Sequence, residues 1–203
     1  MGNRSGTPRY DQIVHMCEQT AANNSDQLPS TLSGDDMRLV QRVWNEVTSD
    51  IDQDVGIDIF KSILSKSEAV RQLFGVSDRD YNNLDMSGRY VSHARLVKNA
   101  LTIFVQDLNA NVETSRIVST LRSLGGRHVS IRKEGFQPDY WYIFAVSMIE
   151  VTRTWPIPKW QRSRFERVWQ ELVCFVIVNM RKGYEQELSK VQYLKSPTSS
   201  TEQ

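Results

Sequence analysis

The sequence predicts an all-α domain of seven to eight helices over about residues 32–189. Apolar side chains recur every three or four residues through most of this stretch, which is the spacing of one helix face. No run alternates between apolar and polar residues for long enough to indicate a strand. Hydrophobic residues make up 39% of the chain and charged residues 24%, so a packed core is feasible.

The first half of the domain contains four predicted helices. The first begins after Ser33, which forms a capping-box pattern with Asp36 three residues later. A second helix is predicted over about 55–65, and a short third helix follows it. The long fourth helix carries an apolar stripe with one histidine in it: Tyr90, His93, Val97, Ala100 or Leu101, Phe104 and Leu108.

Three further helices fill the second half. The first places Ile117, Leu121, Leu124 and His128 on one face, and we expect Gly125 and Gly126 to interrupt it. The next carries Trp141, Phe144, Ala145, Met148 and Val151. The run 155–158, Trp-Pro-Ile-Pro, ends that helix because proline cannot continue it. A final long helix follows this break.

The two ends of the chain differ from the domain in composition. Residues 1–31 are polar, and we expect a mostly flexible extension with one weak amphipathic patch at 13–17. His15 lies in this extension and is interpreted as a solvated histidine. Residues 190–203 end in Ser-Pro-Thr-Ser-Ser-Thr-Glu-Gln and are predicted to form a disordered tail.

Composition excludes several classes of function. The 25 basic and 24 acidic residues nearly balance, so no nucleic-acid partner is expected. Only Cys17 and Cys174 occur, which implies no disulfide framework and favours a reducing, cytoplasmic location. No stretch is apolar enough for a membrane span. Gly2 heads an incomplete myristoylation pattern, with Gly6 where Ser or Thr is usual, so any membrane contact should be weak and reversible.

His93 and His128 are the most informative residues for function. Each lies in the apolar stripe of a predicted helix, and the two helices follow one another. For either histidine alone, a partly buried structural role is the commoner interpretation. Two that face inward together indicate a pair of imidazoles that can bracket a flat cofactor. No cysteine or carboxylate cluster completes a zinc site beside them, and no Cys-x-x-Cys-His motif provides covalent haem attachment.

Signals for a catalytic site are absent from the sequence. It contains no GxGxxG, GxxxxGK[ST], HExxH or GxSxG motif. We therefore expect no enzyme, apart from weak redox activity of a bound cofactor.

Several segments resemble the globin family, and the resemblance covers about residues 32–189. The stretch from Leu39 to Trp44 is similar in spacing to the first helix of vertebrate myoglobin. Phe74 stands thirty residues beyond Trp44, where globins carry the phenylalanine that packs on the haem. The run 93–97, His-Ala-Arg-Leu-Val, resembles the segment that bears the distal histidine. The runs 123–128 and 135–144 resemble neuroglobin-like and nematode globins.

The resemblance implies a globin fold around non-covalently bound haem b. It makes His128 the proximal ligand of the iron and His93 the distal residue, which in neuroglobin-like proteins also binds the iron. The other residues implied to surround the haem are Phe60, Phe74, Leu96, Val97, Leu124, Arg127, Ile131 and Phe136. Two departures from the family pattern leave ligation intact and bear on the haem propionates. Ser67 and Glu68 stand where the third helix usually starts with proline, and Leu96 stands where many globins place a cation, for which Arg127 or Arg95 would substitute.

Three functions remain open from the sequence. The first is an intracellular haem protein that binds oxygen or another diatomic gas. The second is a redox sensor or electron-transfer protein that works with an electron donor or acceptor protein and exchanges little ligand. The third is a haem-free helical interaction module in which both histidines are structural.

Overall fold

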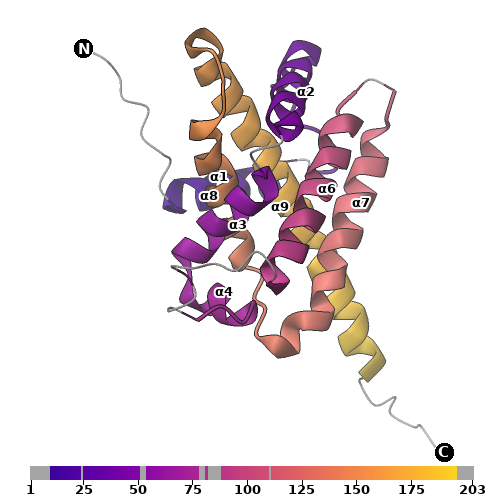
Figure 1. The fold of residues 1–203 in the computed structure, drawn as a ribbon. Helices are drawn as coiled ribbons and strands as arrows, with labels where there is room; N and C mark the ends of the chain where they lie inside the picture. The colour runs from indigo at the N-terminus through magenta and orange to yellow at the C-terminus, as the bar shows by residue number, and fades with distance from the viewer. Residues whose placement is uncertain are drawn as a thin grey trace, which may run out of the picture.

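The computed structural model describes residues 10–23, 25–50, 54–77, 81, 88–109 and 111–195. Every regular element within these residues is a helix, which confirms the all-α prediction (Figure 1). The α-helices are α1 (Tyr10–Ala22), α2 (Gly34–Ser49), α3 (Val55–Lys66), α4 (Glu68–Leu73), α6 (Arg89–Asp107), α7 (Thr114–Arg127), α8 (Tyr140–Val151) and α9 (Lys159–Lys195). Two 3₁₀ helices, η1 (His128–Glu134) and η2 (Thr152–Thr154), follow α7 and α8.

The start of α2 forms the predicted capping box. The Ser33 hydroxyl accepts from the Asp36 amide, and the Asp36 carboxylate accepts from the Ser33 amide at 2.9 Å. Arg164 of α9 donates to the same carboxylate at 2.7 Å. Burial opposes ionisation, but the bonds from Ser33 and Arg164 outweigh it and lower the pKa of Asp36 to about 2. This charged cap joins α2 to α9.

An aromatic cluster forms the centre of the core. Trp44 of α2 stacks on Trp169 of α9, with their ring centres 5.8 Å apart. Trp155, in the break before α9, contacts both rings edge-on. The run 155–158 separates the helices as predicted, since α8 ends at Val151, η2 ends at Thr154 and α9 begins at Lys159.

Glycines allow α7 and α9 to cross at backbone contact. A Cβ atom on Gly125 would lie 1.9 Å from the Met180 carbonyl oxygen, and one on Gly183 would lie 2.0 Å from the Arg122 carbonyl oxygen. Helix α7 continues through Gly125 and Gly126, so the predicted interruption is wrong. Gly125 has a packing role instead, because only a residue without Cβ permits this approach.

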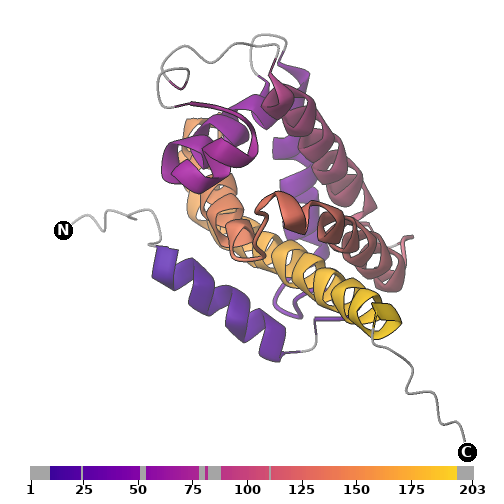
Figure 2. The same ribbon diagram turned by 90° about the horizontal axis from the view of Figure 1, so that it is seen from below.

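The termini of the domain depart from the sequence expectation. Part of the extension expected to be mostly flexible is helix α1, which buries Ile13 and Cys17. Figure 2 shows α1 at the outer edge of the molecule, where it packs against α9 and α8. At the other end, α9 extends beyond the expected boundary at 189 to Lys195, and Figure 1 shows its end reaching past the neighbouring helices. Gly2 and the tail from 196 lie outside the described residues.

Candidate functional site

Two histidines from different helices face each other. His93 lies in the second turn of α6, and His128 ends α7. Their ring centres are 6.3 Å apart and their planes are almost perpendicular, at 88°. The predicted pair therefore comes together in space, although 35 positions separate the two residues in the sequence.

His128 is held in a defined orientation. Its Nδ1 lies 2.9 Å from the carbonyl oxygen of Leu124, one turn earlier in α7. Because a carbonyl oxygen only accepts, Nδ1 carries the proton and the lone pair of Nε2 is left for another partner. Phe136 and Trp141 pack around the ring, with centres 5.2 and 5.3 Å away.

His93 is surrounded by aromatic rings. The centres of Phe60 and Phe74 each lie 5.3 Å from the imidazole centre, and the two phenylalanines contact each other edge-on at 5.1 Å. His93 forms no hydrogen bond with another described residue. Ring packing alone sets its orientation among the residues that the structure describes.

Partial burial favours the neutral form of both imidazoles. Desolvation, followed by the neighbouring charge of His128, lowers the pKa of His93 to about 4. Desolvation also lowers the pKa of His128, although the hydrogen bond to Leu124 acts in the opposite direction. Neutral imidazole is the form that binds metals, so both side chains are in the ligand state at physiological pH.

The donor set fits a metal held between two nitrogens. Two imidazoles that bind one metal ion from opposite sides have ring centres about 6 Å apart, given metal–nitrogen bonds of about 2.0 Å and about 1 Å from each ring centre to its nitrogen. The 6.3 Å separation of His93 and His128 meets this requirement. No cluster of three or more His, Cys, Asp or Glu side chains occurs in the described part of the chain, so a tetrahedral zinc site has no ligands there. Two neutral imidazoles among aromatic side chains would suit a flat metal cofactor such as haem, which they would hold through their nitrogen atoms.

The other predicted site residues divide into three groups. Phe60, Phe74 and Phe136 contact the histidine rings directly, and Leu124 contributes its carbonyl oxygen. The partly buried side chains of Val97 and Ile131 pack against the core.

Leu96 and Arg127 lie at the surface. The Leu96 side chain is 64% exposed and does not join the aromatic shell, so its expected place in an apolar distal wall is not observed. The exposed Arg127, beside the proximal histidine, keeps the solvent-facing position that a propionate contact requires.

Sequence reasoning placed Trp141 in a helix stripe and missed its contact with the site. The Trp141 ring packs against His128 and, on the far side, against Tyr184 of α9 at 5.8 Å. The sequence shows only that Trp141 lies on the helix that follows the proximal segment. The direction in which the Trp141 ring points follows only from the packing of α8 on α9.

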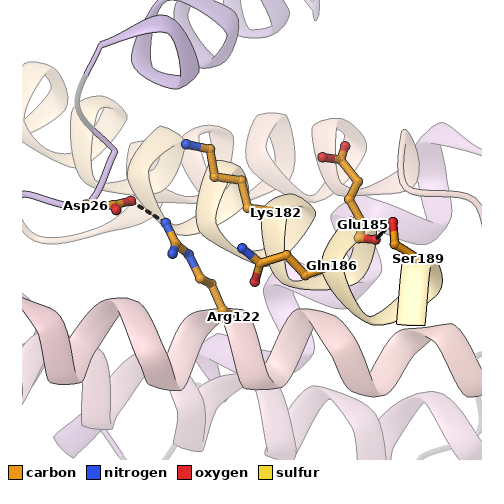
Figure 3. A pocket seen from close by; sticks show the side chains of 6 residues that line it. All are labelled: Asp26, Arg122, Lys182, Glu185, Gln186 and Ser189. Atoms are coloured by element: carbon orange, nitrogen blue, oxygen red, sulfur yellow. Dashed lines mark hydrogen bonds and ion pairs between the residues drawn. The ribbon is translucent and has the colours of Figure 1, made fainter. Parts of the chain in front are cut away.

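A separate hollow lies at the surface near the C-terminal half of α9. It has a volume of about 460 Å³ and is polar. Figure 3 shows Arg122 paired with Asp26 at one side of it, and Lys182 and Glu185 above α9. Two acidic and two basic side chains line this hollow, and neither histidine of the pair lines it. The full lining is Asp26, Arg122, Lys182, Glu185, Gln186 and Ser189.

Comparison with protein families decides the class of the site. The family model described as Globin matches residues 57–180, which include both histidines and the helices that carry them. The chain belongs to the globin family. Globins are haem proteins, and the family membership accounts for an apolar site with two inward histidines.

Two curated relatives share this similarity. The globin-related protein glb-13 of Caenorhabditis elegans is 24% identical over 185 residues, which cover 90% of this chain and 64% of the relative. The chain thus spans less than two thirds of that relative's length. Cytoglobin-2 of Oryzias latipes is also 24% identical, over 155 residues that cover 75% of this chain and 83% of the relative. Within the described residues, no helix is both long and apolar enough to cross a membrane.

Proposed function

We propose that this cytoplasmic globin binds a diatomic gas such as oxygen at a haem b held by His128 and, in the absence of gas, also by His93. The observation that carries the proposal is the pair of neutral imidazoles whose ring centres lie 6.3 Å apart. Bound haem would supply an iron centre that binds small ligands and exchanges electrons. The protein residues supply the ligands, their orientation and the exclusion of water.

His128 is the side chain best suited to permanent ligation. The hydrogen bond to the Leu124 carbonyl oxygen fixes its tautomer and leaves Nε2 free. Contacts with Phe136 and Trp141 prevent the ring from turning. These three constraints support the proximal role.

His93 is the side chain best suited to reversible ligation. It is held by the rings of Phe60 and Phe74 and by no hydrogen bond to another described residue, so it can move without breaking a polar contact. Phe60 has no hydroxyl group to compete for the distal position. An incoming gas would then compete with His93, and the imidazole could donate a hydrogen bond to it after displacement.

Electron exchange is the second candidate, and the contacts of Trp141 favour it. Trp141 joins His128 to Tyr184 through ring contacts of 5.3 and 5.8 Å. Tryptophan and tyrosine are among the side chains most readily oxidised by one electron, so they offer a route between the site and α9. In this role the protein would act with an electron donor or acceptor protein and would exchange little gas.

Absorption spectra of the purified protein test these proposals. We expect a Soret band, which a haem-free interaction module would lack, and split low-spin visible bands in the unliganded ferrous protein. His93→Leu should give a high-spin, five-coordinate spectrum, because the sixth ligand is lost. His15→Leu is the matched control, since His15 is exposed on α1 and should leave the spectrum unchanged.

The outcomes separate the candidates. A wild-type ferrous protein that is already high-spin would contradict ligation by His93 while leaving the proximal role of His128 intact. Among low-spin results, saturable oxygen binding with slow oxidation supports the gas-binding function. Fast electron exchange without oxygen binding supports the second candidate.

A further inference from the structure

The only two cysteines of the sequence meet at the contact between α1 and α9. Cys17 lies on the face of α1 that packs inward, and Cys174 lies on α9. Their Sγ atoms are 2.6 Å apart, and the residues are 1% and 0% exposed. Cys17 precedes the residues that match the family model, so the globin match does not account for this pair.

The distance between the two sulfur atoms is intermediate between a contact and a bond. Non-bonded carbon atoms pack at about 3.5–4.0 Å, and sulfur is larger than carbon. A disulfide bond is about 2.05 Å long, so 2.6 Å is roughly half an ångström from bonding distance. A small movement of α1 is enough to bring the atoms together.

We propose that Cys17 and Cys174 are a reversible disulfide site that fixes α1 to the globin core when the bond is formed. The attachment of α1 to the core depends in large part on the contact between Cys17 and Cys174. Only Ile13 and Cys17 are buried among its 13 residues, and Tyr10 adds an edge-on ring contact with Tyr142 of α8. Reduction of the bond leaves α1 held by these contacts, by the partly buried Met16 and by the hydrogen bonds that join Ser25, just beyond its end, to α9, so α1 can detach more often than in the oxidised protein.

The bond forms by exchange with a low-molecular-weight disulfide such as oxidised glutathione. The thiolate of Cys17 attacks one sulfur of the reagent, forms a mixed disulfide and releases one reduced glutathione. The thiolate of Cys174 then attacks the Cys17 sulfur and releases the second glutathione. Two protein thiols are oxidised, one glutathione disulfide is reduced to two thiols, and the two protons pass to the released glutathione thiolates.

The buried position of the pair makes this exchange depend on the opening of α1. The hydrogen bond with Cys17, followed by burial, raises the pKa of the Cys174 thiol, so little thiolate is present while α1 is docked. A reagent reaches the sulfurs only when α1 lifts from α9. The disulfide is consequently slow to form or break in the folded protein, and an equilibrium test should include refolding.

Thiol counting on the full-length protein tests the site. The chain is refolded with haem in glutathione buffers that range from fully reduced to fully oxidised. Thiol exchange is then stopped with acid, the free thiols are alkylated in denaturant, and the mass of the intact chain is measured. We expect two alkyl groups at the reduced end, none at the oxidised end, and a peptide that joins Cys17 to Cys174 after digestion. The melting temperature of the oxidised protein should be higher by about 5–15 °C, since the bond closes a long loop.

Two variants provide the matched controls. Cys17→Ala and Cys174→Ala should each keep one thiol free of intramolecular bonding and show no rise in melting temperature on oxidation. Two free thiols after refolding in the fully oxidised buffer would overturn the proposal, as would glutathione adducts or intermolecular dimers as the only oxidised products. A Cys17–Cys174 bond without a change in melting temperature would overturn the claim that it fixes α1. Counting thiols by mass is independent of ligand binding, so failure here leaves the proposed gas-binding function untouched.

Discussion

The distal and proximal sides of the site hold the same side chain by different means. On the proximal side, His128 donates to the Leu124 carbonyl oxygen and contacts Phe136 and Trp141. On the distal side, His93 has ring contacts with Phe60 and Phe74 and no hydrogen bond to another described residue. One imidazole is therefore fixed in tautomer and orientation, while the other is held by packing alone.

The helices that carry the two histidines also differ, because the proximal helix is held by more close backbone contacts than the distal helix. Helix α7, which carries His128, meets α9 at Gly125 and Gly183, and each of these glycines touches a backbone carbonyl of the other helix. Helix α6, which carries His93, meets α3 at a single glycine, where a Cβ on Gly56 would lie 2.5 Å from the Ala94 carbonyl oxygen. Two chemically equal ligands therefore become unequal through the backbone that supports them.

Replacing His128 should have the largest effect. His128→Ala removes the only imidazole whose orientation is fixed, and we expect haem affinity to fall by more than the ~10–100-fold typical of residues that merely support a ligand. The haem-to-protein absorbance ratio after purification measures the loss. His93→Ala should retain most of its haem, because the proximal ligand remains. Equal loss in both variants would remove the asymmetry between the two sides.

The crossing of α7 and α9 should show the next largest effect. Gly125→Ala places a methyl group against the Met180 backbone, which cannot move aside as a side chain can, so we expect destabilisation of about 3 kcal/mol or more in urea unfolding. The neighbouring Gly126→Ala is the control. Its nearest atom would be the Cβ of Glu187 at 3.4 Å, and alanine favours a helix by up to about 1 kcal/mol.

The comparison of Gly125→Ala with Gly126→Ala also tests how the proximal histidine is supported. Haem loss should accelerate in Gly125→Ala, because displacement of α7 also displaces His128. If both variants unfold at the same urea concentration, the close backbone contact does not position the proximal helix.

The elements that local chemistry determines were predicted from the sequence. Ser33 and Asp36 form their capping box within one turn, so no distant residue is needed to recognise it. The break at 155–158 follows from two prolines. His93 and His128 could be paired because each interrupts an apolar stripe and because the surrounding segments resemble globins.

The elements that depend on distant partners were not predicted. Helix α1 has only a weak amphipathic pattern, and its position depends on the surface that α9 and α8 present to it. Gly125 and Gly126 have low helix propensity, which predicts an interruption unless the backbone of α9 is known to lie against them. Trp141 likewise gave no local sign that its ring would face His128.

The smallest expected effect concerns which side of α6 faces the haem site. Leu96 is 64% exposed, whereas the adjacent Val97 is partly buried against the core. Leu96→Ala should change the free energy of unfolding by no more than about 0.5 kcal/mol and leave the rate of haem loss unaltered. Val97→Ala should destabilise the protein by about 1 kcal/mol, since it removes two partly buried methyl groups. Transfer of haem to an excess of apomyoglobin measures the rate. Faster transfer from Leu96→Ala than from Val97→Ala would mean that α6 turns Leu96 toward the bound haem, as the resemblance to globins implies. The distal side would then adjust to its cofactor while the proximal side is already in place.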